Sequence, residues 1–298
     1  MRTYPGCIVC FFRQALEAAK ISGADEKTQN RILIELSQKL PDFSLNSSPP
    51  EMGRLVYRLV TDITRRKDPY LEIKQKSNKF AFSMYNELKK RIASSPNPLI
   101  EAVEISIVGN IIDYGIYNSN DITENVRELL IKEERAVKEE EEEFFNYPAF
   151  ESALKQAENI LYLGDNAGEI VFDRLLIEEI KRLYPDKKIT FAVKGGAIIN
   201  DALVADAEEC GITGVARVIT NGVDAPGTLL SLCSPEFSEA YNQAQLIISK
   251  GQGNFETLSS EEKPIFFLLM AKCPVVAAHI GCETGTFLLL NISSTDFL

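Results

Sequence analysis

The chain has 298 residues and an apolar content of 45%, which is enough to bury a sizeable core and argues against a disordered protein. Its net charge of −11 argues against nucleic-acid binding and against docking on anionic membranes, because both need clustered positive charge. No apolar run approaches the roughly 20 residues of a membrane-spanning helix, so we expect a cytoplasmic protein that acts on a small molecule.

Residues 1–135 show helical periodicity almost throughout, interrupted by turn signals rich in proline and serine. This pattern predicts an all-helical domain over residues 1–148, which we expect to pack back on the functional site. The acidic segment 138–145 lies near its end, and repulsion between like charges favours a solvated helix face or connector there.

After Pro148, short β-rich runs alternate with helical stretches, which predicts βαβ units and a parallel sheet over residues 149–298. Two further apolar runs follow at 265–270 and 274–280. We expect the second to be a buried strand, whereas periodicity alone does not decide the first. The predicted fold class is therefore α/β. The expected strands of the alternating part are 159–163, 189–193, 217–220 and 245–249.

Polar side chains follow the first two of these strands. Asp165 and Asn166 lie in a Gly-Asp-Asn-Ala-Gly-Glu turn, and Asp201 comes shortly after Lys194-Gly195-Gly196. Because the carboxyl ends of parallel strands meet at one edge of a sheet, we expect Asp165 and Asp201 to converge. Two carboxylates and an amide oxygen suit a divalent ion such as Mn²⁺, Mg²⁺, Co²⁺ or Ni²⁺. The alternative is that Asp165 or Asn166 only caps the next helix.

The strand ending at 249 leads into Lys250-Gly251-Gln252-Gly253-Asn254. Such a turn aims backbone N–H groups at an anion while Lys250 supplies positive charge. We therefore expect Lys250, Gly251 and Asn254 to bind the substrate. The competing interpretation is a surface lysine beside an ordinary turn.

Asn110 and Asp113 are three residues apart in the helical part, and this spacing places both on one helix face. They either close over the site and contact the substrate or form an internal hydrogen-bonded pair.

Four motifs in order resemble the damage-control phosphatase family, long catalogued as domain of unknown function 89. They are Gly-Asn-Ile-Ile-Asp at 109–113, Gly-Asp-Asn-Ala-Gly-Glu at 164–169, Val-Lys-Gly-Gly to Asn-Asp at 193–201, and Ser-Lys-Gly-Gln-Gly-Asn-Phe-Glu at 249–256. The likeness spans nearly the whole chain. Its Cys-x-x-Cys start is similar to the shorter, prokaryotic-type branch.

The resemblance implies a Rossmann-like α/β domain that hydrolyses phosphometabolites, including sugar phosphates or damaged cofactor intermediates. It also implies a divalent metal at Asp165, Asn166 and Asp201, with Lys250 at the substrate phosphate. Phosphoryl transfer needs its developing charge neutralised, which a metal and a lysine provide. We accordingly predict Asp165, Asp201 and Lys250 as catalytic residues. Lys194 is the next candidate for binding the phosphate.

Two other functions compete with this one. A nucleotide-cofactor enzyme has only the fold class in its favour, because the chain lacks both Gly-x-Gly-x-x-Gly and the Gly-x-x-x-x-Gly-Lys-Ser/Thr loop. A metal-binding or sugar-phosphate-binding protein without turnover remains the main alternative. Release of inorganic phosphate distinguishes it from a phosphatase.

Cys7 and Cys10 have the spacing of a soft-metal or redox pair. Two ligands do not complete a zinc site, so Cys273, together with Cys282 or His279, has to join them by folding. The alternative is that the thiols act as small, partly buried hydrophobes.

Overall fold

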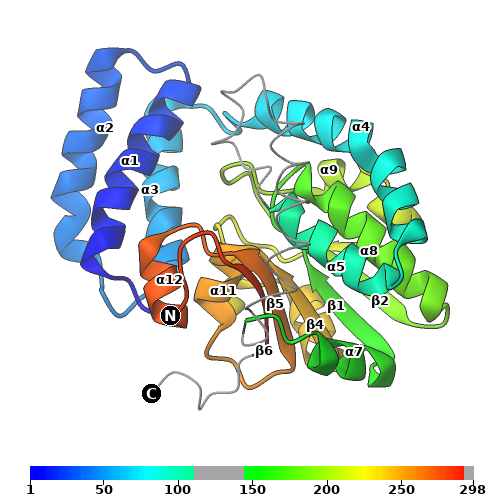
Figure 1. Ribbon diagram of the computed structural model, residues 1–298. Helices are drawn as coiled ribbons and strands as arrows, with labels where there is room; N and C mark the ends of the chain where they lie inside the picture. The colour runs from blue at the N-terminus through cyan, green and yellow to red at the C-terminus, as the bar shows by residue number, and fades with distance from the viewer. Residues whose placement is uncertain (111–143, 292–298) are drawn as a thin grey trace.

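The computed structural model describes residues 1–110 and 144–291. Asp113 and the acidic residues 138–143 therefore lie outside the described residues. The N-terminal part is helical, as the periodicity predicts (Figure 1). Three of its helices begin with a proline in their first turn, where the missing N–H costs no hydrogen bond. The helices are α1 (Pro5–Ile21), α2 (Glu26–Lys39), α3 (Pro49–Thr64), α4 (Leu71–Ser94) and α5 (Pro98–Gly109).

A six-stranded sheet follows, with the strand order β3-β2-β1-β4-β5-β6. The first five strands are parallel, and β6 pairs antiparallel with β5. This mostly parallel sheet confirms the predicted α/β class. The chain changes direction across the sheet between β1 and β4, which is where ligands bind in open parallel sheets. The strands are β1 (Asn159–Leu163), β2 (Lys188–Val193), β3 (Arg217–Thr220), β4 (Leu246–Lys250), β5 (Ile265–Met270) and β6 (Phe287–Asn291).

Helices cover both faces of the sheet. Alternate residues of β1 point to opposite sides, so Ile160 and Tyr162 join one hydrophobic core while Leu161 and Leu163 join the other. The first core holds α4, α5, α7 (Tyr147–Gln156) and α8 (Glu169–Leu183). The second holds α10 (Pro235–Gln243), α11 (Gln252–Leu258) and α12 (Pro274–Ile280), and α9 (Val204–Glu209) precedes β3.

Helices α1, α2 and α3 share a third core, formed around Phe11, Ile32 and Val56. They stand beside α11 and α12, on the other side of the molecule from α4 and α5 (Figure 1). The helical part is thus divided in its packing, because α4 and α5 belong to the core that covers the sheet. The division of the chain at residue 148 stays a prediction.

The predicted strand at 274–280 is wrong, because these residues form α12. Pro274 occupies its first turn, and the Cys273 sulfur accepts a hydrogen bond from the backbone N–H of Val276 at 3.5 Å. Only Val276 and Ala277 of this run are buried, so a one-sided helix satisfies its apolar character. The run at 265–270, whose structure periodicity did not decide, is strand β5. The sequence did not predict strand β6.

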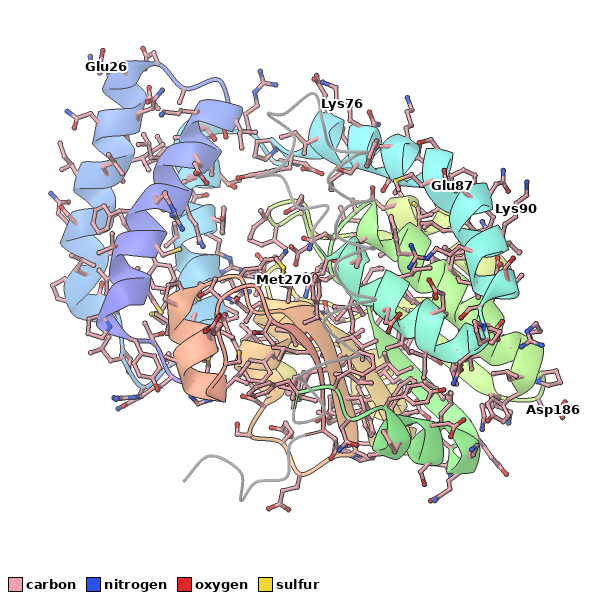
Figure 2. The ribbon with its side chains drawn as sticks, viewed as in Figure 1. Glu26, Lys76, Glu87, Lys90, Asp186 and Met270 are labelled. Atoms are coloured by element: carbon pink, nitrogen blue, oxygen red, sulfur yellow. The ribbon has the colours of Figure 1, made fainter. Side chains whose placement is uncertain are left out.

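Charged side chains lie around the outside of the molecule. Figure 2 places Glu26, Lys76 and Asp186 at its periphery, whereas Met270, at the end of β5, lies near the middle. Across residues 1–110 and 144–291, no helix is both long and apolar enough to cross a membrane.

Candidate active site

The structure brings Asp165, Asn166 and Asp201 together at the carboxyl edge of the sheet. Asn166 and Asp201 pair in an isolated antiparallel β-bridge. The carbonyl oxygen of Asp165 accepts a hydrogen bond from the backbone N–H of Ala202 at 2.8 Å. These backbone contacts hold the loops after β1 and β2 against each other, so the side chains of two separate loops share one place.

A cavity of about 630 Å³ opens over these three residues. Its other wall comes from the N-terminal helices, including Cys7 and Cys10 of α1 and Tyr57 of α3. The residues around α11 and α12 complete it, among them Gln252, Glu256, Lys272 and Cys273. The cavity therefore has an acidic end at the sheet and a mixed polar and aromatic end at the helices.

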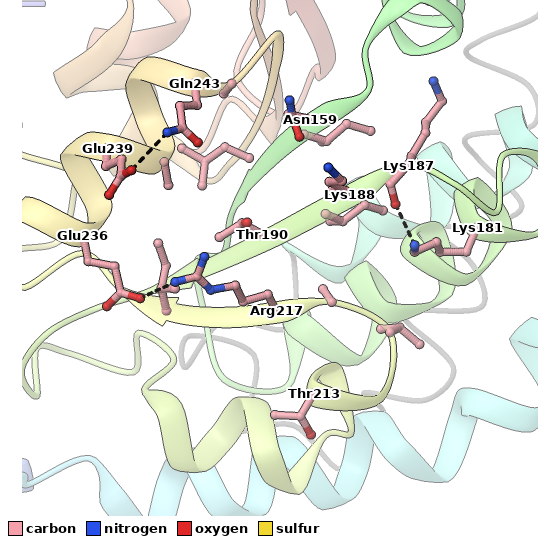
Figure 3. Close-up of a pocket in the computed structure, with 18 of the residues that line it drawn as sticks. Asn159, Lys181, Lys187, Lys188, Thr190, Thr213, Arg217, Glu236, Glu239 and Gln243 are labelled. Carbon is pink, nitrogen blue, oxygen red and sulfur yellow. Dashed lines mark hydrogen bonds and ion pairs between the residues drawn. The ribbon is translucent and has the colours of Figure 1, made fainter.

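A hollow of the same volume, about 630 Å³, lies at the opposite edge of the sheet (Figure 3). Its charged groups bind one another or backbone carbonyls: Arg217 donates to Glu236 at 2.7 Å, and Lys181 donates to the carbonyl oxygen of Lys187 at 2.6 Å. Asn159, Lys188 and Arg217 there begin their strands. We place the functional site at the carboxyl edge, because loops and helix N-termini converge only there.

Burial, followed by the charges of Glu169 and Asp201, raises the pKa of Asp165 well above its usual range. Lys194 and Lys272 oppose this shift only in part. The acidic end of the cavity thus holds more negative charge than its own cations balance. A divalent ion would relieve this repulsion.

The oxygen atoms present fit such an ion. The side-chain nitrogen of Asn166 donates to Asp165 Oδ2 at 2.8 Å and to Glu169 Oε2 at 3.0 Å, so the amide oxygen is the Asn166 atom left to act as a ligand. No cluster of three or more His, Cys, Asp or Glu suitable for a metal occurs in the part of the chain that the structure describes. Two carboxylates and an amide leave positions for water and substrate, as Mg²⁺ sites commonly do.

Lys250 does not line the cavity. Its fully buried ammonium lies 2.9 Å from Glu169 Oε1, 2.8 Å from Asp173 Oδ1 and 2.6 Å from the carbonyl oxygen of Ser106. These three contacts use its three donors. Burial pulls the pKa of Lys250 down, but the two carboxylates more than offset this and hold it above its ordinary value. Burial also raises the pKa of Asp173, to about 6.

Lys250 is connected to the site by its ion pair with Glu169. The other oxygen of Glu169 accepts hydrogen bonds from Asn166 and, at 2.9 Å, from Asn110. Asn110 also donates to Asp165 Oδ2 at 3.2 Å. Asn110, the C-cap of α5, therefore holds the side chains of Asp165 and Glu169 in place. Its predicted partner Asp113 lies outside the described residues.

Lys194 lies close to one of the candidate metal ligands. Its ammonium lies 3.5 Å from Asp201 Oδ2 and 3.4 Å from Asn254 Oδ1. The Asn254 amide is itself held by Thr228 and by the carbonyl oxygen of Lys250. Asn254 therefore positions Lys194 from behind the cavity.

The thiols of Cys7, Cys10 and Cys273 line the same cavity, although their residues are far apart in the sequence. Burial raises the pKa of Cys7. Cys10 accepts a hydrogen bond from Gln14, and Cys273 accepts one from Gln252. All six cysteines of the chain are free thiols here. Their role as a second metal or redox site stays a prediction.

Sequence reasoning assigned no role to four charged residues of the site. Glu169 and Asp173 are one helical turn apart at the start of α8. Glu169 also ends the Gly-Asp-Asn-Ala-Gly-Glu motif, but no other feature of the sequence indicated Asp173. Glu256 and Lys272 line the cavity from the far side. The sequence does not indicate that Lys272 comes near Asp165, because the approach depends on how the loop after β5 folds.

Comparisons with known proteins identify the family of this chain. The model of the damage-control phosphatase ARMT1-like domain matches residues 3–288. The chain belongs to the damage-control phosphatase family.

Two relatives and one solved structure illustrate the match. The damage-control phosphatase PH1575 of Pyrococcus horikoshii is 34% identical, with 98% of each chain covered. The uncharacterized protein MJ0202 of Methanocaldococcus jannaschii is 36% identical, over 96% of this chain and 94% of that protein. The crystal structure of a DUF89 family protein from P. horikoshii superimposes with a TM-score of 0.87 at 33% identity, covering 98% of this chain and 99% of the other.

In this damage-control phosphatase family member, Gly251 makes room for Asp165. Its φ is +80°, and a Cβ added there would lie 2.0 Å from Asp165 Oδ2. We expect Gly251→Ala to displace the carboxylate and lower any metal-dependent activity by about 10²-fold or more. Gly281→Ala is the matched control, because Gly281 has φ +89° with no atom within 4 Å of the added carbon. Equal losses in both variants would trace the effect to backbone strain alone.

Proposed function

We propose that this protein is a metal-dependent phosphatase that hydrolyses phosphomonoesters of small metabolites, such as sugar phosphates or damaged cofactor intermediates. The observation that carries the proposal is the convergence of Asp165, Asn166 and Asp201 on one end of a cavity large enough for a metabolite. Family membership supports it, because relatives over the full chain are named damage-control phosphatases.

The side chains supply what phosphoryl transfer needs. A divalent ion held by Asp165, Asn166 and Asp201 adds positive charge beside the phosphoryl group. The ammonium of Lys194, next to Asp201, adds a second positive charge at the same end. The carboxylates of Asp165 and Asp201 are within the cavity and orient the attacking water or accept its proton.

The contacts of Lys250 favour Lys194 over Lys250 as a lysine that acts on the phosphate, although neither lines the cavity, whereas Lys272 does. Lys250 is enclosed by Glu169, Asp173 and Ser106, so it acts on the substrate only through the residues it positions. Lys194 has longer contacts, at 3.4 and 3.5 Å, and an arriving phosphate oxygen can compete with them.

Phosphate release after metal removal tests the proposal. We expect the chelated protein to release no inorganic phosphate from a panel of phosphosugars and phosphorylated cofactor fragments, and Mn²⁺, Mg²⁺, Co²⁺ or Ni²⁺ to restore turnover. A protein that binds these compounds in calorimetry but releases no phosphate with any ion is a binding protein. Full turnover after chelation would exclude the metal.

A further inference from the structure

We propose that Glu256 is a further catalytic residue, which donates a proton to the oxygen of the leaving alcohol. The inference rests on the proposed phosphatase function. It starts from a need of that chemistry: metal ligands neutralise the phosphoryl group, but an alkoxide that leaves a sugar or another alcohol is strongly basic and needs a proton.

The position of Glu256 fits that role. The phosphoryl group occupies the end of the cavity at Asp165 and Asp201, so the leaving alcohol extends toward the remaining walls. Glu256 lines one of these walls. It follows Gly251, which touches Asp165, by five residues, or about 7.5 Å along the helix axis.

The orientation of Glu256 also fits. Helical side chains lean toward the N-terminus of their helix, which in α11 is the end next to Asp165. The hydrogen bond from Gln252 to Glu256 Oε1, at 2.9 Å, shows this direction, because Gln252 lies one turn earlier. Gln252 is in turn held by the backbone N–H of Lys272 at 3.3 Å. The Glu256 carboxyl group is thus held by the Gln252 side chain, which is held in turn by the backbone of Lys272.

The surroundings of Glu256 keep a substantial fraction of it protonated near neutral pH. Burial raises its pKa to about 7, and the hydrogen bond from Gln252 and the charge of the Met1 amino group oppose this rise. The Met1 amino group donates to the carbonyl oxygen of Glu256 at 2.6 Å. Cys7 of α1 also faces Glu256, and the carboxylate helps to raise the pKa of that thiol. Gln252 also donates to the sulfur of Cys273.

The proton and electron pairs balance in one step. Water forms the new bond to phosphorus and gives a proton to a carboxylate of the site. The bond from phosphorus to the ester oxygen breaks, its electron pair stays on that oxygen, and the proton of Glu256 completes the alcohol. The site carboxylate then releases its proton to solvent, and solvent returns a proton to Glu256.

Two substrate types separate this role from a structural one. An alkyl phosphate needs the proton, whereas 4-nitrophenyl phosphate leaves as a stable phenolate and does not. We expect Glu256→Gln to lower kcat/KM for a sugar phosphate by about 10²-fold or more and to leave 4-nitrophenyl phosphate nearly unchanged. Glu262→Gln, an exposed carboxyl just beyond α11, is the control and should change neither rate.

The pH dependence of the metal-loaded wild type gives a second measurement that needs no variant. The ratio of the alkyl to the aryl rate cancels the titration of groups that act on both substrates, such as the metal ligands. This ratio should fall as the pH rises through about 7 and become flat in Glu256→Gln. Equal loss of both substrates, or a pH-independent wild-type ratio, would overturn the proposal. A wild type that releases phosphate from neither substrate would instead overturn the phosphatase function itself.

Discussion

Asp165→Asn should abolish metal-dependent turnover, with a loss of at least about 10²-fold, while the fold stays intact. The change is nearly isosteric and removes one of the two carboxylate ligands. The variant should also be more stable than the metal-free wild type at pH 8. The folded pKa of Asp165 is raised, so the metal-free folded state binds more protons than the unfolded state. Its stability therefore falls as the pH rises above the unfolded value of about 3.9.

Urea denaturation at pH 6 and pH 8, with and without Mn²⁺, checks both parts of this prediction. We expect the wild type to lose stability with rising pH without metal and to regain it with Mn²⁺, whereas Asp165→Asn responds weakly to both. Asp186→Asn is the matched control, because Asp186 is exposed in a turn far from the site. An Mn²⁺ response in Asp165→Asn equal to that of the wild type would remove Asp165 from the metal site.

Lys250→Met should destabilise the protein by about 3–5 kcal/mol, because it leaves two buried carboxylates without their cation. The affected groups are Glu169 and Asp173, both fully buried. Since Glu169 also holds Asn110 and Asn166, we expect the variant to lose metal affinity along with stability. Denaturation midpoints and Mn²⁺ titration measure the two effects.

Lys89→Met is the matched control for this prediction. Lys89 pairs with Glu178 at 2.6 Å, but its side chain is 56% exposed, so its loss should cost at most about 1 kcal/mol. A Lys250→Met variant that keeps its stability and its metal affinity but loses turnover would return Lys250 to the substrate phosphate.

The sequence predicted the sheet well because buried parallel strands leave continuous apolar runs bounded by turns. The strands at 159–163 and 217–220 have the predicted bounds. The prediction for 274–280 failed because a short, mostly apolar run of seven residues suits either a strand or a helix. Here Pro274 in the first turn and the Cys273 cap decide for the helix.

The site was predictable only as far as topology determines it. The ends of parallel strands must meet at one edge, and this rule alone brings Asp165 and Asp201 into one place. The rule does not say which way Lys250 points. Its ammonium turns toward α8 because Glu169 and Asp173 stand there, and the packing of that helix on β4 is a long-range contact. The sequence analysis expected the helical part to pack back on the site but did not indicate which of its residues line the cavity, since Cys7 and Asp201 are distant in sequence.

The separate core of α1, α2 and α3 bears on how this protein can diversify. The end of the cavity that holds Asp165, Asn166 and Asp201 rests on the sheet and its two cores. Gln14 and Glu17 on the opposite wall belong to α1, which packs mainly with α2 and α3. If this cavity binds the substrate, we expect substitutions on that wall to change what it binds without disturbing Asp165, Asn166 or Asp201. One reaction centre can thus acquire new substrates by mutation of a single helix face.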